Sequence, residues 1–443
     1  TQYGDGNNAH ALVQAMVQNY IRKEGDIIFG DRDAESGLNN AIALSPEEVI
    51  QTVKKARLRG RGGAGFPTGM KWDFTRKAAG QRKFVICNAD EGEPGTFKDR
   101  VLLTEKVDLL LEGMTIAGYA IGAEEGIIYL RAEYMYLRNY LQSMIEKRSE
   151  NNLLGQNILG KTGFDFRVRI QMGGGAYICG EESALISSCE GLRGDPKTRP
   201  PFPAQKGDLG CPTSVNNVET LCAVACILDQ GAEKYQAIGT PGSSGTKLLS
   251  ISGDCEHPGV YEFPIGVSIK ELLSAAGAKD TQAVLVGGPS GQFVNPEQFD
   301  RVICFDDLST GGALVIFNRK RDLIPIVGQY LEFFIEESCG YCTPCRAGTV
   351  LMRQRLREIL AGRGQEADLN YLLDLGQTIK KTSRCGLGQT ACNPVLSTLQ
   401  NFPGLYAAVL TPADDSSQAS FDIFQALQDH ETLAGRKSEI FKH

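Results

Sequence analysis

The 443-residue sequence predicts an α/β protein built in three parts. Strand, loop and helix follow one another up to about residue 235, an order that favours an α/β layer. From residue 246, short β-rich runs surround one helix, which indicates a compact α+β module of roughly 80 residues, within the usual size of a domain. From residue 326 the pattern becomes helical and predicts a small bundle.

The first part opens with helical patterns and continues with buried strands. Apolar residues recur at helical spacing from Ala9 to Lys23, so we expect residues 1–45 to form an N-terminal helical segment. Ser45 before Pro46 and two glutamates is typical of a capped helix start. The elements expected after it are a strand at 83–89, a helix at 108–121, a strand at 126–130, a helix at 134–147 and a strand at 166–172.

The second and third parts differ in their periodicity. The β-rich runs lie at residues 247–252, 284–286 and 313–317, around a helix at 268–276. Helical patterns then follow at residues 327–337, 348–360, 368–381 and 394–402, and their short links favour a bundle. A polar tail is expected after residue 410.

Composition excludes several classes of function. Lysine and arginine number 46 against 53 aspartates and glutamates, so the net charge of −7 argues against a general nucleic-acid surface. The chain has no apolar run of 18 residues and no leader, so we expect no transmembrane segment and no export. Its 13 cysteines are scattered, mostly in apolar or glycine-rich contexts, which favours reduced thiols in the cytoplasm. None of the four histidines lies near a nucleophile, so redox chemistry is favoured over hydrolysis.

The most informative motif is ESCGYCTPCR at residues 337–346. Cys339, Cys342 and Cys345 have the C-x2-C-x2-C spacing that holds three corners of a cubane iron–sulfur cluster. Position 349, where a ferredoxin run would place the fourth cysteine, is threonine. Cys385 is the preferred fourth ligand, because glycines beside it let backbone N–H groups approach the cluster sulfurs. Cys392 is the competing candidate.

A structural zinc site is the alternative interpretation of these cysteines. Zinc usually takes two separated pairs of ligands, whereas here a triplet is followed by single cysteines. The spacing therefore favours a 4Fe–4S cluster, and a chain with one such cluster moves electrons singly. A zinc-stabilised nucleotide-binding scaffold without turnover remains the rival hypothesis.

Three loops are suited to bind a flat, phosphorylated ligand. The loop at residues 58–69, LRGRGGAGFPTG, contains G-x-G-x-x-G, but a helical pattern precedes it, so an ordinary Rossmann turn is rejected. Its bare backbone can still approach a phosphate or a ring. The loop NADEGEPG at residues 88–95 follows a strand, where ligands bind in open α/β sheets. The glycine-rich loop at residues 173–183 follows another strand and enters a helix with an acidic first turn.

Together these residues resemble the flavin-bearing, NADH-oxidising subunit shared by respiratory complex I, NAD-dependent formate dehydrogenases and NAD-reducing hydrogenases. The resemblance runs from about residue 45 to 405 and rests on RGRGGAGFP at 59–67, NADEGE at 88–93, GEES at 180–183, NNVET at 216–220 and ESC at 337–339. It implies an α/β protein with a non-classical Rossmann-like FMN/NADH domain over residues 46–240, a ubiquitin-like β-grasp module over 241–325 and a C-terminal helical bundle carrying the 4Fe–4S cluster over 326–410, with a tail at 411–443.

The resemblance also assigns roles to individual residues. Those expected to bind FMN are Gly60, Arg61, Gly62, Lys71, Asn88, Asp90, Glu91, Gly180, Glu181, Asn216 and Asn217. Phe66, Phe74 and Phe202 would sandwich the adenine of NADH. Glu93 and Glu182 would meet its nicotinamide side and ribose hydroxyls, which favours NADH over NADPH. Cys339, Cys342, Cys345 and Cys385 match the cluster ligands.

Several segments resemble the hydrogenase branch of the family, the diaphorase α-subunits of NAD-reducing [NiFe]-hydrogenases. They are SGDCEHPG at 252–259, NRKRD at 318–322 and KTSRCGLG at 381–388. Hydride would pass between NAD(H) and FMN, single electrons between FMN and the cluster, and no general base is assigned. The implied partners are an iron–sulfur electron-transfer subunit and hydrogenase subunits. Because only about 45 residues precede the shared core, we expect the 2Fe–2S module of larger members to be absent or supplied by another subunit. Complex I or formate dehydrogenase is the alternative assembly.

Overall fold

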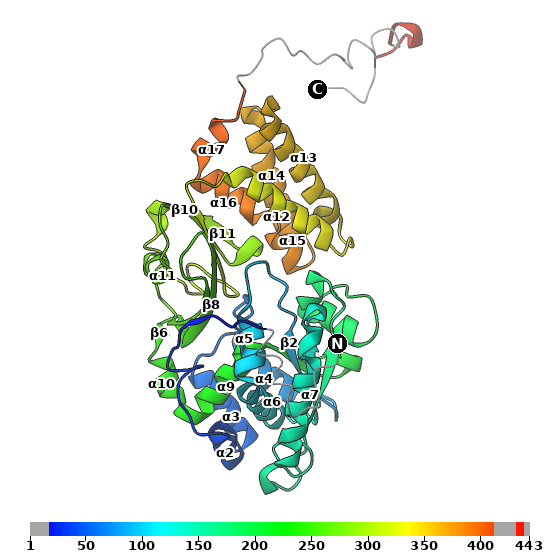
Figure 1. Cartoon of the computed structure of the whole chain (residues 1–443). Coiled ribbons are helices and arrows are strands. Elements are labelled where there is room, and N and C mark those ends of the chain that lie inside the picture. The colour runs from blue at the N-terminus through cyan, green and yellow to red at the C-terminus, as the bar shows by residue number, and fades with distance from the viewer. Residues whose placement is uncertain (1–16, 412–430, 438–443) are drawn as a thin grey trace.

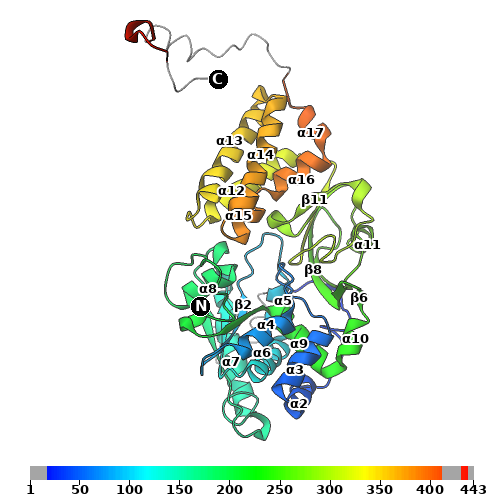
Figure 2. The ribbon, with the colours of Figure 1, turned by 180° about the vertical axis from the view of Figure 1, so that it is seen from behind.

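The computed structural model describes residues 17–411 and 431–437. Figures 1 and 2 show the α/β layer at one end of the molecule, the helical bundle at the other, and a mixed sheet beside the junction between them. Most of the expected polar tail at 411–443, and also His10, His430 and His443, lie outside the described residues. No helix within the described ranges is long and apolar enough to cross a membrane.

A four-stranded parallel sheet forms the centre of the α/β layer. Its strands are β2 (Phe84–Ala89), β3 (Glu125–Leu130), β4 (Arg167–Met172) and β5 (Thr213–Asn217), in the order β4-β3-β2-β5. The chain therefore adds β3 and β4 on one side of β2 and β5 on the other. This reversal makes a topological switch point at the carboxyl ends of β2 and β5, which is where open α/β sheets bind ligands.

Helices cover both faces of this sheet because residues of its buried strands alternate between the two faces. Val85, Cys87 and Ala89 of β2 join the largest hydrophobic core, whereas Phe84 and Ile86 join a second one. The helices of the layer are α2 (Ser36–Ala43), α3 (Pro46–Lys55), α4 (Thr68–Lys77), α5 (Lys98–Glu105), α6 (Val107–Ile121), α7 (Arg138–Glu150), α8 (Glu182–Cys189), α9 (Val218–Gln230) and α10 (Ala232–Gln236). α6 and α9 are buried along almost their whole length.

The expected helix start at Ser45 is confirmed. The Ser45 hydroxyl accepts a hydrogen bond from the backbone N–H of Glu48, and the Glu48 carboxylate accepts one from the N–H of Ser45 at 2.7 Å. This capping box, with Pro46 in the first turn, satisfies donors that the helix itself leaves unpaired.

The second sheet has six strands in the order β1-β9-β8-β12-β10-β11. They are β1 (Ile21–Lys23), β8 (Thr246–Gly253), β9 (Gly259–Pro264), β10 (Thr281–Val286), β11 (Gln292–Val294) and β12 (Ala313–Asn318), accompanied by the helix α11 (Ile269–Ala275). The central pair β8 and β12 is parallel. β9 is antiparallel to β8, and β10 is antiparallel to β12. A short hairpin of β6 (Gly239–Thr240) and β7 (Ser243–Ser244) precedes this sheet.

The N-terminal segment corrects one expectation. The periodicity from Ala9 to Lys23 predicts a helix. Residues 9–16 of this stretch lie outside the described residues, and Ile21–Lys23 is the strand β1, which pairs parallel with β9. The buried carboxylate of Glu262 on β9 holds the following turn, because it accepts hydrogen bonds from the N–H groups of Ile28 at 2.9 Å and Phe29 at 3.1 Å. Tertiary pairing therefore overrides the local helical pattern.

The bundle shares its core with the second sheet. Its helices are α12 (Leu323–Glu337), α13 (Thr349–Glu358), α14 (Glu366–Thr382), α15 (Gly386–Thr390), α16 (Asn393–Asn401) and α17 (Pro403–Ala407). Ala283 and Leu285 of β10 pack in one core with the bundle helices, whereas Val284 and Val286 face α11 and the rest of the sheet. The alternation along one strand thus serves two separate cores.

Candidate functional site

The switch point of the parallel sheet brings together several of the predicted residues. Asn88, near the end of β2, lies opposite Asn217 at the end of β5. The Asn88 amide donates to the carbonyl oxygen of Gly180 at 2.7 Å and accepts from the N–H of Asp90 at 3.1 Å. The acidic loop after β2 and the glycine-rich loop after β4 are therefore joined at one edge of the sheet.

Asp90 carries an unsatisfied acceptor at this edge. The residue is half-buried, but its Oδ2 atom is fully buried and has no hydrogen-bond partner. Burial raises the pKa of Asp90 to about 7, although the nearby Arg131 opposes the rise. A buried oxygen without a partner costs free energy unless a ligand supplies a donor. The site therefore fits a ligand with N–H or hydroxyl groups, such as the flavin ring or ribityl chain of FMN.

The first glycine-rich loop comes close to the same strand ends. A Cβ atom on Gly62 would lie 3.4 Å from the Cβ of Asn217, so the bare backbone of the loop passes close to the end of β5.

The side chain of Arg61 points into the protein, although its motif predicts that it lines the FMN site. Its guanidinium is buried and donates to the Tyr235 hydroxyl and to the Ser244 carbonyl, each at 2.7 Å. Arg61 thus anchors the loop, and the backbone is the part of the loop available to a ligand.

Two acidic residues of the site are held by basic side chains. Lys71 donates to the carbonyl of Val215 at 2.9 Å and pairs with Glu182 at 3.4 Å. Arg199 pairs with Glu182 at 3.1 Å and also with Glu181. Glu181 in turn caps α8, since its carboxylate accepts from the first backbone N–H groups of that helix. Arg199 is absent from the residues predicted from sequence, although it opens the proline-rich loop that carries Phe202.

Glu91 and Glu93 face different neighbours. Glu91 accepts from the N–H groups of Asp99 at 2.8 Å and Arg100 at 3.1 Å, so it caps the N-terminus of α5. Burial raises the pKa of Glu91 to about 7. Glu93 accepts from the Tyr177 hydroxyl and from the N–H of Ser290 at 2.8 Å, and burial raises the pKa of Glu93 as well. Glu93 therefore connects the α/β layer to the second sheet.

The three predicted aromatics keep large free faces. The side chains of Phe66, Phe74 and Phe202 are 45%, 49% and 52% exposed. Phenylalanine side chains are more often buried in a protein core. Phe74 lies on α4, one turn after Lys71, so it projects from the same side of the helix as that lysine. Exposed rings of this kind can stack on a flat base.

A buried charged cluster next to the site was missed by the sequence reasoning. Lys98 pairs with Asp99 at 2.6 Å and with Glu219 at 2.9 Å, and Lys247 pairs with Glu219 at 2.5 Å. All four side chains are at most 5% exposed. Glu219 stands in the NNVET motif, and Lys247 is a lysine within a buried β run, which is the one local signal that could have indicated a buried partner.

The four candidate cluster cysteines lie against one face of the parallel sheet. Cys339, Cys342, Cys345 and Cys385 all pack on the hydrophobic core that contains Phe84 and Ile86 of β2, Ile127 and Tyr129 of β3 and Val215 of β5. Cys385 is the N-cap of the short helix α15; burial raises the pKa of its thiol, and the backbone N–H groups of Gly388 and Leu387 oppose that rise. Such donors stabilise thiolates and the sulfurs of a cluster. Cys392 belongs instead to the core of the bundle.

A zinc ion and a cubane cluster require different arrangements of four thiols. Zinc needs four ligands at about 2.3 Å for sulfur, so its thiolates crowd together. Each thiol of a cubane cluster binds a different iron atom, and the thiols therefore stand further apart.

Tyr177 lies between the sheet edge and these cysteines. Its hydroxyl contacts Glu93 and is 2.8 Å from that of Ser290, while its backbone N–H donates to Glu337 at 2.7 Å. The Tyr177 ring packs edge-on against Phe333 of α12 at 5.1 Å. Burial and the Glu93 carboxylate keep the pKa of Tyr177 well above its usual value. Tyr177 thus joins the loop after β4 to the helix that leads into the first cysteines.

Comparison with known proteins decides the family. Residues 53–226 match the Nuo51 FMN-binding domain, and residues 325–409 match the NADH-ubiquinone oxidoreductase-F iron–sulfur binding region. The chain is 51% identical over 432 residues to the NAD-reducing hydrogenase HoxS subunit alpha of Cupriavidus necator, covering 97% of this chain and 72% of that protein. The chain belongs to the family of flavin-bearing, NADH-oxidising subunits. This match confirms FMN and a 4Fe–4S cluster as the cofactors of the chain. It also confirms that the chain is an oxidoreductase acting on NADH.

Other members of the family show how wide the likeness is. An NADH-quinone oxidoreductase subunit of Aquifex aeolicus is 43% identical over 83% of this chain and 87% of its own length. The NADP-reducing hydrogenase subunit HndC of Solidesulfovibrio fructosivorans is 42% identical over 84% of this chain and 78% of its own. A crystal structure of an NAD+-reducing [NiFe]-hydrogenase in the H2-reduced state matches 99% of this chain and 78% of that one, with a TM-score of 0.84 and 41% identity.

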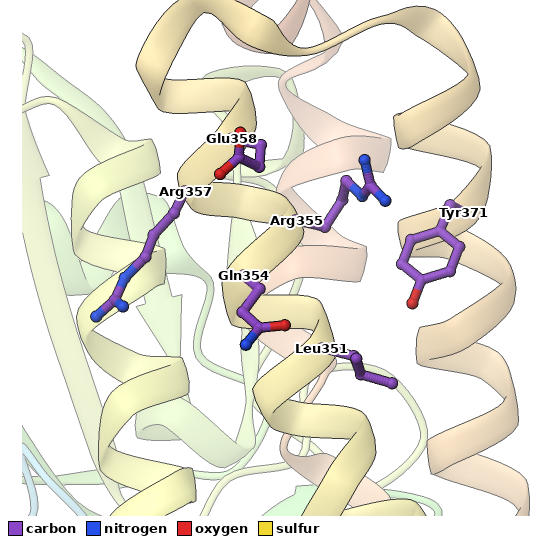
Figure 3. Close-up of a pocket in the computed structure, with 6 residues that line it drawn as sticks. All are labelled: Leu351, Gln354, Arg355, Arg357, Glu358 and Tyr371. Atoms are coloured by element: carbon purple, nitrogen blue, oxygen red, sulfur yellow. The ribbon is translucent and has the colours of Figure 1, made fainter. Parts of the chain in front are cut away.

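A separate pocket lies away from these features, between α13 and α14 of the bundle (Figure 3). It is lined by Leu351, Gln354, Arg355, Arg357, Glu358 and Tyr371. Arg355 stands over the Tyr371 ring at 5.2 Å and pairs with Asp368 at 2.9 Å. None of the residues that the family resemblance assigns to a cofactor lines this pocket, and we attach no function to it.

Proposed function

We propose that this chain is the diaphorase subunit of a multisubunit NAD-reducing hydrogenase. It would transfer hydride between NAD(H) and FMN and single electrons between FMN and a 4Fe–4S cluster, coupling NAD+ reduction to H2 oxidation. Bound FMN supplies the step from two-electron to one-electron chemistry, and the protein supplies binding, orientation and exclusion of water. The hydrogenase assignment is supported by the 51% identity to the HoxS alpha subunit over 97% of the chain.

One observation carries the proposal: the switch point of the parallel sheet and the four cysteines share a hydrophobic core. Strands β2, β3 and β5 contribute side chains to that core, Cys345 belongs to it, and the other three cysteines pack against it. Asn88, Asp90 and Asn217 stand at the carboxyl ends of the same strands. A flavin bound at these ends and a cluster on these cysteines would therefore be neighbours, as electron transfer between them requires.

The residue roles are proposed as follows. The backbone at Gly60, Arg61 and Gly62, together with Lys71, Asn88, Asp90, Gly180, Asn216 and Asn217, would bind FMN, while Glu91 and Glu181 would position the loops as helix caps. Phe66, Phe74 and Phe202 would hold the adenine ring, and Glu93 and Glu182 the nicotinamide side and ribose. Cys339, Cys342, Cys345 and Cys385 would hold the cluster. Glu182 is supported as a ribose contact by its carboxylate beside Lys71, whose side chain is 24% exposed like that of Glu182.

We propose domain boundaries at residues 46–240 for the FMN and NADH domain, 241–325 for a ubiquitin-like β-grasp module and 326–410 for the iron–sulfur bundle. The β-grasp assignment is supported by the strand order β9-β8-β12-β10-β11 with α11 between β9 and β10. In that arrangement the first and last strands of the module are parallel neighbours at its centre, as β8 and β12 are.

The proposed partners are an iron–sulfur electron-transfer subunit and the hydrogenase subunits. The related proteins named as hydrogenase and NADH-quinone oxidoreductase subunits make a hetero-oligomer the expected state. A cytoplasmic location is proposed because all 13 cysteines are free thiols. Complex I is the second candidate assembly, favoured by the 43% identity to the Aquifex aeolicus oxidoreductase subunit.

Anaerobic titration with NADH tests the proposal. The full chain, reconstituted with FMN and its cluster, would be titrated while the flavin absorbance and the EPR signal of the reduced cluster are recorded. We expect the flavin to bleach and the cluster signal to rise together. A chain that retains zinc instead of iron and sulfide, or a flavin that stays oxidised in excess NADH, would refute the assignment.

A further inference from the structure

The side chain of Asn217 is held in one orientation by its neighbours. Its Oδ1 atom accepts from the ammonium of Lys98 at 3.2 Å and from the backbone N–H of Glu219 at 3.0 Å. Its Nδ2 atom donates to Oδ2 of Asp99 at 2.7 Å. Exchanging the amide oxygen and nitrogen would turn an NH2 group toward Lys98 and an oxygen toward a carboxylate, so the network fixes the orientation.

This network decides what Asn217 can offer a ligand. An asparagine amide has two acceptor sites on its oxygen and two N–H donors on its nitrogen. Lys98 and Glu219 use both acceptor sites, and Asp99 uses one donor. One N–H group is left, so Asn217 can only donate to an acceptor atom of a bound ligand.

The cluster that holds Asn217 extends into the second sheet. Lys98 lies between Asp99 and Glu219, and Glu219 is shared with Lys247 on β8, whose ammonium also donates to the carbonyl of Leu248 at 3.2 Å. The other Glu219 oxygen accepts from the N–H of Leu248 at 2.9 Å. The two lysines thus link α5, α9 and β8 through one carboxylate.

Lys98 has no room to move away from this position. A Cβ atom on Gly312 would lie 2.8 Å from the Cδ of Lys98, because the loop before β12 packs directly on the lysine stem. The next glycine, Gly311, approaches the first glycine-rich loop, with its Cα 3.8 Å from where a Cβ of Gly63 would lie.

The two lysines lower the pKa of Glu219 to about 2 despite its burial. Lys98 is the firmer cation of the two, because the surrounding carboxylates raise its pKa, whereas burial lowers the pKa of Lys247 to about 7.

We propose that Lys98, Asp99, Glu219 and Lys247 form a positioning cluster that fixes Asn217 as a one-donor contact for an acceptor oxygen of FMN. The affinity of the α/β domain for FMN would then depend on a lysine from the neighbouring sheet. This inference rests on the proposed function, because it takes Asn217 as a residue of the FMN site. None of the four charged residues needs to touch FMN for it to hold.

A double-mutant cycle on FMN affinity tests this coupling. The full chain, stripped of FMN and retaining its cluster, would be titrated with FMN, and the dissociation constant measured from the quenching of flavin fluorescence. Asn217→Ala removes the donor and should raise the dissociation constant on the order of tenfold. Lys98→Met should raise it by a similar factor in the wild-type background and leave it unchanged in the Asn217→Ala background.

Two further variants keep the test clear of general destabilisation. Lys247→Met leaves Glu219 paired with Lys98, so it should fold where Lys98→Met does not, and should weaken FMN binding only when Asn217 is present. Arg148→Met is the matched control. It breaks another buried ion pair, with Glu35 at 2.7 Å, and should lower the melting temperature without changing FMN affinity.

The outcomes separate this inference from the proposed function. If Lys98→Met and Lys247→Met weaken binding by the same factor with and without Asn217, or not at all, the positioning cluster is refuted while the function stands. If the wild-type chain binds FMN and Asn217→Ala binds it equally well, the inference again fails alone. If the wild-type chain binds no FMN, the proposed function fails with it.

Discussion

Replacing Asp90 by asparagine should stabilise the FMN-free chain at pH 8. Burial raises the pKa of this carboxyl from 3.8 to about 7, so the folded state binds its proton more tightly than the unfolded state. The contribution of this bound proton to the free energy of unfolding is fully present below pH 4 and is lost as the pH rises to 7. Above pH 7 the folded chain therefore holds an unfavourable buried charge, and asparagine removes it.

The size of the gain follows from the same shift. About three pH units at 1.36 kcal/mol each give an upper limit on the order of 4 kcal/mol. Asp90 is only half-buried and water can reach part of it, so we expect ~1–3 kcal/mol at pH 8. The gain should shrink as the pH falls from 7 toward 4, because the wild-type carboxyl then becomes neutral in the folded state.

Urea unfolding of the FMN-free chain at pH 8 and pH 5 would measure this effect. Asp306→Asn is the matched control, since its side chain is 65% exposed and the change should be within about 0.5 kcal/mol at both pH values. A stability gain for Asp90→Asn that is equal at the two pH values would contradict the electrostatic reasoning. So would a loss of stability at pH 8. FMN binding by Asp90→Asn should weaken, because the neutral amide oxygen accepts a hydrogen bond less strongly than the carboxylate and the amide nitrogen can only donate.

Three other changes test the cluster, the nucleotide site and the fold. Cys385→Ser should lose most iron and acid-labile sulfide, whereas Cys392→Ser should keep both, because Cys392 lies in the bundle core. Loss from Cys392→Ser with retention in Cys385→Ser would reverse the ligand assignment. Phe74→Ala should raise the KM for NADH roughly tenfold with little change in melting temperature, since the ring is 49% exposed, and an unchanged KM would remove Phe74 from the adenine site. Ser45→Ala should cost about 1 kcal/mol in urea unfolding by removing the cap of α3, and a loss below about 0.3 kcal/mol would mean that the capping box is unimportant.

The parts of the fold predicted from sequence are those set by local pattern. The strand at Phe84–Ala89 and the helix at Val107–Ile121 are apolar runs of the length expected for each element. The spacing of three residues between Ser45 and Glu48 predicts the capped start of a helix. The prediction failed at Ile21–Lys23, where a three-residue strand depends on pairing with β9, more than 230 residues later. Local periodicity carries no information about such a partner.

The candidate site divides in the same way. The cysteine spacing and the glycine-rich loops are local signals, so the family and its cofactors could be recognised. The buried cluster of Lys98 and Lys247 is harder to predict, because their partners Asn217 and Glu219 are 119 and 28 residues away in the chain. The one local signal is the position of Lys247 within an apolar β run. Glu91 was expected beside the flavin as part of its motif, but its carboxylate is occupied by the N-terminus of α5.

The strand β10 has a consequence for dividing the chain. Its two faces belong to different cores: Ala283 and Leu285 are fully buried among bundle helices, and Val284 and Val286 among the residues around α11. Cutting between residues 325 and 326, the proposed boundary of the iron–sulfur bundle, would therefore divide the core that both fragments share. The isolated bundle would expose an apolar surface and self-associate, and the two regions should melt in a single heat-capacity peak. The bundle and the second sheet are therefore one folding unit, although residues 325–409 match a family model of their own.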